Sequence, residues 1–206
     1  MKVAWSGRIV SIQPRIRLTR SFDESSHSYL GYCLVVVGVI GDETGAFSIG
    51  IGEVAHLKHG FRAGDQVSGE SMPVAYRERE PVAYYRTSKL RVLGRGEEEG
   101  AKPPPWHGVP LDLETYRSRG CRRLSARTYD TRCTTCIWGC RMPVQMIIDP
   151  WNPVVRYRRE TFCYGPKSCP YYRAGPKRVV PGRKGMQYEE PDWVDEQATE
   201  HRGMDD

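Results

Sequence analysis

Six of the seven cysteines of this 206-residue chain lie in one short stretch, and that density constrains the fold more than any other feature. The six fall between Cys121 and Cys169. Because the first residues carry no apolar stretch of the kind that directs export, a disulfide framework is not the first expectation. The cluster instead predicts a metal centre, with reactive thiols or disulfides as the remaining alternative. Cys33 lies apart from the others in an apolar run and is expected to be a core residue.

The spacing of the cysteines predicts how four sulfur atoms meet. Three thiols lie within eight residues in Cys133-Thr-Thr-Cys136-Ile-Trp-Gly-Cys140, and Cys163 follows after 22 more residues. Apolar residues alternate on both sides of a turn at 149–153, which predicts a β-hairpin over 144–161. The hairpin would return Cys163 to the neighbourhood of Cys140, so that a tight loop and a hairpin base together supply four sulfur atoms.

The stretch from Cys133 to Cys163 resembles the small [4Fe–4S] domain that opens molybdopterin-dependent oxidoreductases such as formate dehydrogenases. That family has a Cys-x2-Cys-x3-Cys run, a hairpin, and a fourth cysteine near a Gly and a Lys, which are Gly165 and Lys167 here. The resemblance covers about a sixth of the chain and implies a [4Fe–4S] cluster. It does not extend to catalysis, because nothing else in the chain resembles a pterin-binding domain. The ligands it implies are Cys133, Cys136, Cys140 and Cys163.

Two alternatives stay open at this centre. Cys169-Pro170 resembles the Cys-Pro ending of ferredoxin ligand runs, which makes Cys169 the rival for the fourth place, and Cys121 is a further candidate thiol. Zinc also takes four thiolates and commonly uses Cys-x2-Cys half-sites. This chain offers only one such pair, and an iron–sulfur cluster accepts uneven spacing because its corners lie several ångströms apart. Zn²⁺ is therefore the alternative cofactor.

The first 95 residues predict a small barrel. Strand patterns cover 3–13, 29–40, 45–51, a stretch beginning at Val67, and 84–93, with a short helix over 53–58. This order, and the turn from Phe61 to Val67, resemble the OB-fold, which often binds single-stranded nucleic acid. The predicted fold class is mainly β with short helices, with a five-stranded OB-like barrel followed by a small cysteine-rich metal-bound domain with a β-hairpin.

Composition divides the rest of the chain. Residues 96–106, rich in Glu, Gly and Pro, predict a linker, and residues 107–188 a basic cysteine-rich domain. Residues 116–188 hold 16 basic and 3 acidic side chains, whereas 189–206 hold 1 and 8, which predicts an acidic tail. A block this basic is expected to attract a polyanion or an acidic partner, and the tail is expected to compete for the same surface.

These features predict a nucleic-acid-binding protein in which a metal centre, a [4Fe–4S] cluster, stabilises the cysteine-rich domain. The alternatives are a small iron–sulfur electron-transfer protein that docks an acidic protein partner, and a zinc-binding structural module. Arginine beside aromatic rings suits phosphate pairing and base stacking on a single strand. The residues expected to contact nucleic acid are Arg122, Arg123, Arg156, Arg158, Arg159, Lys177, Arg178, Arg183, Lys184, Lys89 and Arg91.

Other function classes find no support in the sequence. The chain has no phosphate loop, no dinucleotide fingerprint and no nucleophile elbow, so no enzyme class is predicted. The longest apolar run, residues 33–40, is far shorter than the roughly 20 residues of a membrane helix. A cytoplasmic protein without a membrane partner is the expectation.

Overall fold

The computed structural model describes residues 1–22, 24–97, 102–152 and 154–206. The chain is mainly β, with 46% strand and 18% helix. The strands are β1 (Val3–Arg20), β2 (Ser25–Ile40), β3 (Glu43–Ile51), β4 (Gln66–Pro73), β5 (Tyr84–Gly94), β6 (Arg122–Arg123), β7 (Gly139–Asp149), β8 (Val154–Cys163), β9 (Val179–Pro181) and β10 (Gln187–Glu189). The helices are α1 (Glu53–His59), α2 (Leu113–Arg119), α3 (Ala126–Thr128) and α4 (Trp193–Thr199). The expectation of a mainly β chain with short helices is confirmed.

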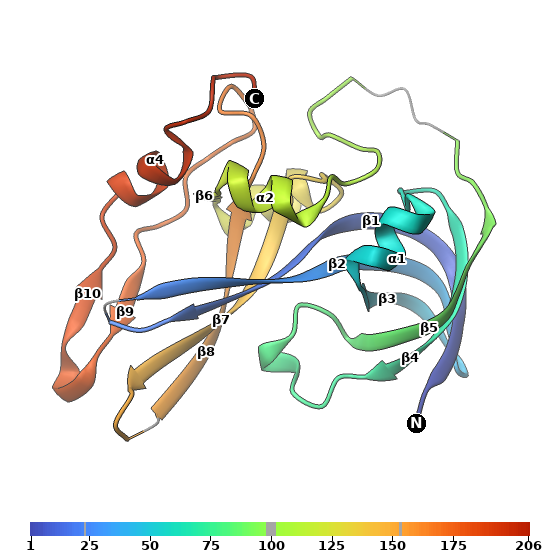
Figure 1. The fold of residues 1–206 in the computed structure, drawn as a ribbon, viewed down its shortest axis with the longest axis horizontal. Coiled ribbons are helices and arrows are strands. Elements are labelled where there is room, and N and C mark those ends of the chain that lie inside the picture. The colour runs from blue at the N-terminus through green and yellow to red at the C-terminus, as the bar shows by residue number, and fades with distance from the viewer. Residues whose placement is uncertain (23, 98–101, 153) are drawn as a thin grey trace.

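Strands β1 to β5 close a ring. β1 pairs antiparallel with both β2 and β4, β2 pairs with β3, and β5 joins β3 to β4. Apolar side chains on alternate positions, such as Phe47, Ile49 and Ile51 of β3, pack into the shared core. α1 connects β3 to β4, and its buried His56 contacts the carbonyl oxygen of Pro110 at 3.0 Å. Figure 1 shows the ring at the N-terminal end of the molecule.

A β-bulge in β1 changes which side chains face the core. The pairing with β2 slips between Ile9 and Ser11, so that the buried apolar residues change from odd positions to even ones, Ile12, Ile16 and Leu18. The side chains of Ser11 and Gln13 are thereby turned toward the segment that contains the cysteines. The sequence analysis ended this strand at Gln13, but the strand continues to Arg20.

The cysteine-rich part is not a separate small domain in the described residues, which corrects the predicted architecture. β7 pairs in parallel with the end of β1, from Leu18 opposite Val144 to Arg20 opposite Met146. The predicted hairpin is present as β7 and β8, and it continues the sheet to β6. One hydrophobic cluster contains side chains from the ring and from the cysteine-rich part, among them Leu34 and Trp138. The predicted linker 96–106 includes residues 98–101, which lie outside the described residues.

The C-terminal segment covers the hairpin. β9 and β10 pair with each other, and Figure 1 shows them with α4 beside β7 and β8, on the side away from the ring. The backbone of this segment also contacts the loop after Cys163, because the Ser168 amide donates to the Met204 carbonyl at 2.8 Å. In the described part of the chain, no helix is both long and apolar enough to cross a membrane.

A close backbone approach in the ring gives a stability prediction. A Cβ atom on Gly38 would lie 2.1 Å from the carbonyl oxygen of Ser6 on the paired strand, and backbone cannot move aside as a side chain can. Gly38→Ala should therefore lower the free energy of unfolding by about 1 to 3 kcal/mol, measured by urea denaturation. Gly94→Ala is the matched control, since its Cβ would meet only the Gln66 Cβ at 3.8 Å. Equal stability of the two variants would contradict the prediction.

Candidate metal centre

The loop that carries Cys133 and Cys136 is a tight turn. It follows a π-helical turn, η2 (Tyr129–Cys133). The Cys136 amide donates to the Cys133 carbonyl at 3.2 Å, and the Gly139 amide donates to the Cys136 carbonyl at 3.0 Å. Backbone amides of Trp106 and Trp138 hydrogen-bond to the Cys136 sulfur. Amide donors stabilise a thiolate, which is the form that binds metals.

β1 holds this loop in place through two polar side chains. The Gln13 amide nitrogen donates to the carbonyl oxygens of Cys133 and Cys136, both at 2.8 Å, and its oxygen accepts from the Tyr129 hydroxyl at 2.6 Å. The Ser11 hydroxyl donates to the Thr134 carbonyl at 2.6 Å. Side chains of β1 thus satisfy three carbonyl groups of the loop with hydrogen bonds. Polar residues in an otherwise apolar strand were the sequence signal for this contact, and the sequence analysis did not use it.

A second loop brings Cys163 and Cys169 to the same place. Cys163 ends β8 directly opposite Gly139, which follows the first loop. The Gly165 amide donates to the Cys163 sulfur at 3.4 Å, and the Cys169 amide donates to the Pro166 carbonyl at 3.2 Å. The Tyr164 amide donates to the Trp138 carbonyl at 2.9 Å, which joins the two loops.

The thiols of the two loops interact electrostatically in every pair. Burial, followed by the charges of the other three cysteines, raises the pKa of Cys133 to about 12. Burial is also the main cause that raises the pKa of Cys136 to about 11, although its amide contacts lower it, and Cys163 and Cys169 raise it further. Burial raises the pKa of Cys163, and the charge of Cys169 raises it further. Such crowding of thiols is stable without a metal only when they are protonated.

Cys140 lies on the other side of the hairpin from Cys163. It pairs with Phe162, one position away from the Gly139–Cys163 pair, and successive strand residues point to opposite faces. Its thiol is fully buried and donates to the Pro14 carbonyl at 3.4 Å, and the cysteines that interact with it are Cys121 and Cys33. The Cys140 thiol therefore faces away from Cys163, whereas Cys169 is among the thiols that interact with Cys133, Cys136 and Cys163.

The donor set fits a thiolate centre, although the thiols are not arranged as a coordination shell. Within residues 1–22, 24–97, 102–152 and 154–206, no group of three or more His, Cys, Asp or Glu side chains is placed so that it could hold a metal ion. Cys121 is held outside the set of four, and its pKa is raised to about 12, chiefly by burial. Cys133, Cys136, Cys163 and Cys169 interact electrostatically with one another, and these four thiols are the candidate ligands.

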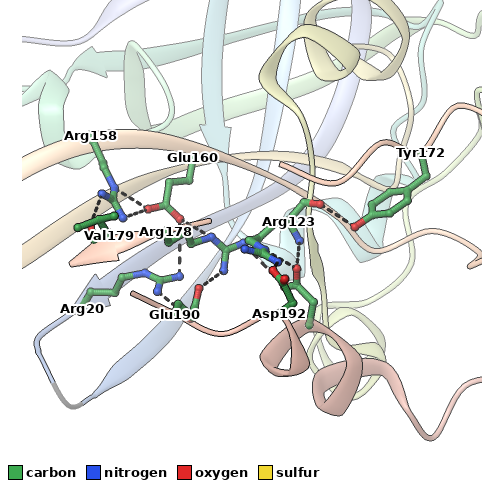
Figure 2. A network of polar contacts seen from close by, with 10 residues as sticks. Arg20, Arg123, Arg158, Glu160, Tyr172, Arg178, Val179, Glu190 and Asp192 are labelled. Carbon is green, nitrogen blue, oxygen red and sulfur yellow. Dashed lines mark hydrogen bonds and ion pairs between the residues drawn. The ribbon is translucent and has the colours of Figure 1, made fainter. Parts of the chain in front are cut away.

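Most of the residues predicted to contact nucleic acid already interact with other residues of the protein. Figure 2 shows Arg123, Arg158 and Arg178 in a network with acidic residues. Arg123 contacts Asp192 and Asp195 of the C-terminal segment, which confirms that this segment folds back onto the basic block. Of the other predicted residues, Lys177 pairs with Glu189, Lys89 pairs with Glu70, Arg122 stacks on Tyr172, and Arg159 donates to the carbonyls of Arg77 and Glu80.

Four of the predicted residues remain exposed and form no ion pair in the part of the chain that the structure describes. They are Arg91, Arg156, Arg183 and Lys184. They lie on three separate elements, β5, β8 and the turn between β9 and β10, rather than on one face built around the cysteines. These four residues therefore do not form one continuous cationic surface.

A groove lies instead on the outer face of β2 and β3. Two adjoining hollows of about 400 and 390 Å³ share Val35 and Ser48. Arg141 lines the first hollow, and Arg77 lines the second. The lining also includes rings and polar groups from several elements, namely Tyr84, Phe47, Tyr129, Gln13, Thr134 and Thr135. Ala46 and Ser48 of β3 also line the groove.

The buried part of the charge network gives a pH-dependent prediction. Glu190 contacts Arg20 at 2.8 Å and Arg178 at 2.6 Å, and all three side chains are buried. Burial alone would raise the Glu190 pKa, but the two arginines outweigh burial and lower it. Ionised Glu190 therefore stabilises the fold fully above its unfolded-state pKa of about 4.3, and the contribution is lost as the pH falls through the lower folded-state pKa.

Glu190→Gln should reduce the free energy of unfolding at pH 7 by about 2 kcal/mol or more, because it leaves two buried guanidinium groups without a charge partner. Urea denaturation between pH 3 and pH 7 measures this, and the variant should lose less stability than the wild type toward acid. Glu189→Gln is the control, since its pair with Lys177 is more than half exposed and should contribute little. Identical pH profiles for wild type and Glu190→Gln would refute the assignment.

Comparison with models of protein families, with curated proteins and with solved structures found no match to this chain. The geometry of its own residues is therefore the basis on which a function can be inferred.

Proposed function

We propose that the protein binds nucleic acid on an OB-like barrel and that a [4Fe–4S] cluster staples its cysteine-bearing loops. The proposed ligands are Cys133, Cys136, Cys163 and Cys169. The observation that supports the proposal is that the loop of Cys133 and Cys136 and the loop of Cys163 and Cys169 both adjoin the base of the β7–β8 hairpin, where their thiols interact electrostatically. Backbone amides directed at the sulfur atoms of Cys136 and Cys163 support thiolate ligation.

The spacing of the ligands favours a cluster over a single zinc ion. The four cysteines are separated by 2, 26 and 5 residues, so only one Cys-x2-Cys pair is present. Zinc ribbons commonly use two such pairs to place four sulfur atoms about 2.3 Å from one ion. A cubane presents its four iron corners several ångströms apart and tolerates uneven loops. When bound, the cluster supplies folding free energy and one-electron redox capacity.

Exchange of single cysteines separates the two candidate ligand sets. Cys169→Ala should lose most of the bound metal, whereas Cys140→Ala should keep it, because the Cys140 thiol faces the core on the other side of the hairpin. Anaerobic purification followed by iron, sulfide and zinc analysis and an absorbance spectrum measures this. Cys121→Ala is a second control.

The result expected for the wild type is a brown protein with about four irons per chain. Metal loss from Cys140→Ala with retention in Cys169→Ala would reverse the ligand assignment. A colourless wild type with one zinc would replace the cluster by the zinc-binding structural module. Reversible bleaching by dithionite without any nucleic-acid binding would favour the electron-transfer protein.

The barrel supports the nucleic-acid part of the proposal. Its ring order, β1-β2-β3-β5-β4 with a helix between β3 and β4, is the order of the OB-fold. OB-folds bind single strands on the face of their second and third strands. The groove lies on that face and is lined by Tyr84, by Arg77 and by Arg141, which pairs with Asp130 and would exchange that partner for a phosphate.

Binding of single-stranded DNA and RNA should weaken steeply as salt rises, because phosphate contacts release counterions. Arg77→Gln combined with Arg141→Gln should lower affinity about tenfold or more at low salt and flatten the salt dependence. Fluorescence anisotropy with labelled 12-mers between 50 and 300 mM salt is a suitable measurement. Lys58→Gln, an exposed cation on α1 away from the groove, is the control. Salt-independent binding, or an equal effect of Lys58→Gln, would contradict the groove as the site.

A further inference from the structure

Three consecutive carbonyl groups of the second cysteine loop are each bound by arginine. The Tyr164 carbonyl accepts from Arg119 and from Arg202, both at 3.0 Å. Arg202 also donates to the Gly165 carbonyl at 3.1 Å. Arg122 donates to the Pro166 carbonyl at 3.0 Å. On the sulfur side of the same loop, the Gly165 amide donates to Cys163. The loop therefore turns a donor toward the thiol and its acceptors toward three positive charges.

The three arginines come from two parts of the chain, the segment of Arg119 and Arg122 and the C-terminal segment of Arg202. Arg119 ends α2, Arg122 begins β6, and Arg202 follows α4. The guanidinium groups of two of them stack on aromatic rings. Arg119 lies 4.5 Å from the centroid of the Trp138 ring, and Arg122 lies 3.9 Å from the centroid of the Tyr172 ring. Because the contacts join α2, β6 and the C-terminal segment at one loop, their convergence is a property of the tertiary fold.

These charges are not balanced by acidic side chains. None of the three forms an ion pair with Asp or Glu in the described part of the chain, although Asp206 interacts with Arg119 at longer range. The Arg202 side chain is 7% exposed, and among the described residues its Nε and Nη2 atoms have no hydrogen-bond partner. Nη2 of Arg119 and Nε of Arg122 are also buried and have no partner in the described part of the chain. Burial of a guanidinium without a counter-charge is unfavourable, so an anion near this arginine collar, Arg119, Arg122 and Arg202, would stabilise it.

Negative charge near these arginines comes from Asp206, which interacts with Arg119, and from the Cys163 thiol, which interacts with Arg119 and Arg202. Burial, followed by the charges of Arg119 and Arg122, lowers the pKa of Arg202 to about 10, and the Cys163 thiol opposes that shift. Four thiolates around a divalent core carry a net negative charge, whether the core is a zinc ion or an oxidised cubane. The charges of the collar and the centre are therefore complementary.

We infer that Arg119, Arg122 and Arg202 are positioning residues that supply the counter-charge of the metal centre and so retain the metal and raise its reduction potential. The inference rests on the proposed metal centre. Groups that contact metal ligands from outside commonly alter metal affinity 10- to 100-fold. Removal of a positive charge near a cluster also favours its more oxidised, less negative state.

The test uses the full chain with Arg202→Gln, Arg122→Gln and, as control, Arg183→Gln, an exposed cation on the β9–β10 turn. Metal release is followed with a chromogenic chelator, bathophenanthroline for iron or pyridylazoresorcinol for zinc. Both collar variants should release metal about tenfold faster than wild type, and the control should match wild type. Where iron is bound, a dithionite titration should show a lower midpoint potential in the collar variants. Arg202→Lys should restore part of the retention, because it keeps the charge.

The outcomes distinguish this inference from the proposed centre. A wild type without metal overturns both. A metal-loaded wild type with equal release rates and, for iron, equal potentials in all variants overturns the collar alone. Equal rates combined with a lower melting temperature would show that the arginines only cap loop carbonyls. If Arg202→Gln does not fold, the half-buried Arg122→Gln decides the question by the same measurements.

Discussion

The buried amide of Gln13 is the contact on which the arrangement of the cysteines depends. It joins the ring to the first cysteine loop by donating to two loop carbonyls while it accepts from Tyr129. The contact exists because the bulge in β1 turns the side chains of Ser11 and Gln13 away from the core and toward the loop that precedes β7. Ring and loops consequently share one sheet and one core, and the cysteine loops are shaped before any metal is considered.

The sequence predicted the fold where the signal was local. Alternation over 45–51 and 144–161 predicted β3 and the hairpin, because each strand buries one face. The second half of β1 was missed, because Pro14, Arg15 and Arg17 do not resemble an apolar strand. Its parallel contact with β7 joins segments more than 120 residues apart, and no local pattern encodes such a pairing.

The candidate site was predictable in composition but not in detail. The resemblance implied Cys133, Cys136, Cys140 and Cys163 as ligands, with Cys169 as the rival of Cys163 for the fourth place. It did not reveal that Cys140 and Cys163 point to opposite faces, because the exact register of the hairpin decides which face a side chain occupies. Charge counting had the same limit. It measured the excess of arginine correctly, but it could not predict which cations the C-terminal acids neutralise, which stack on rings, and which gather at the loop after Cys163.

The pairing of Gly139 with Cys163 also limits which insertions and deletions the β7–β8 hairpin can tolerate. Loss or gain of one residue within an arm of the hairpin would turn the Cys163 side chain to the core face, away from the other candidate ligands. Loss or gain of two residues would preserve its orientation. Homologous proteins that use the same sulfur atoms should therefore differ in arm length by even numbers of residues, with odd changes confined to the tip around Trp151, which is 83% exposed.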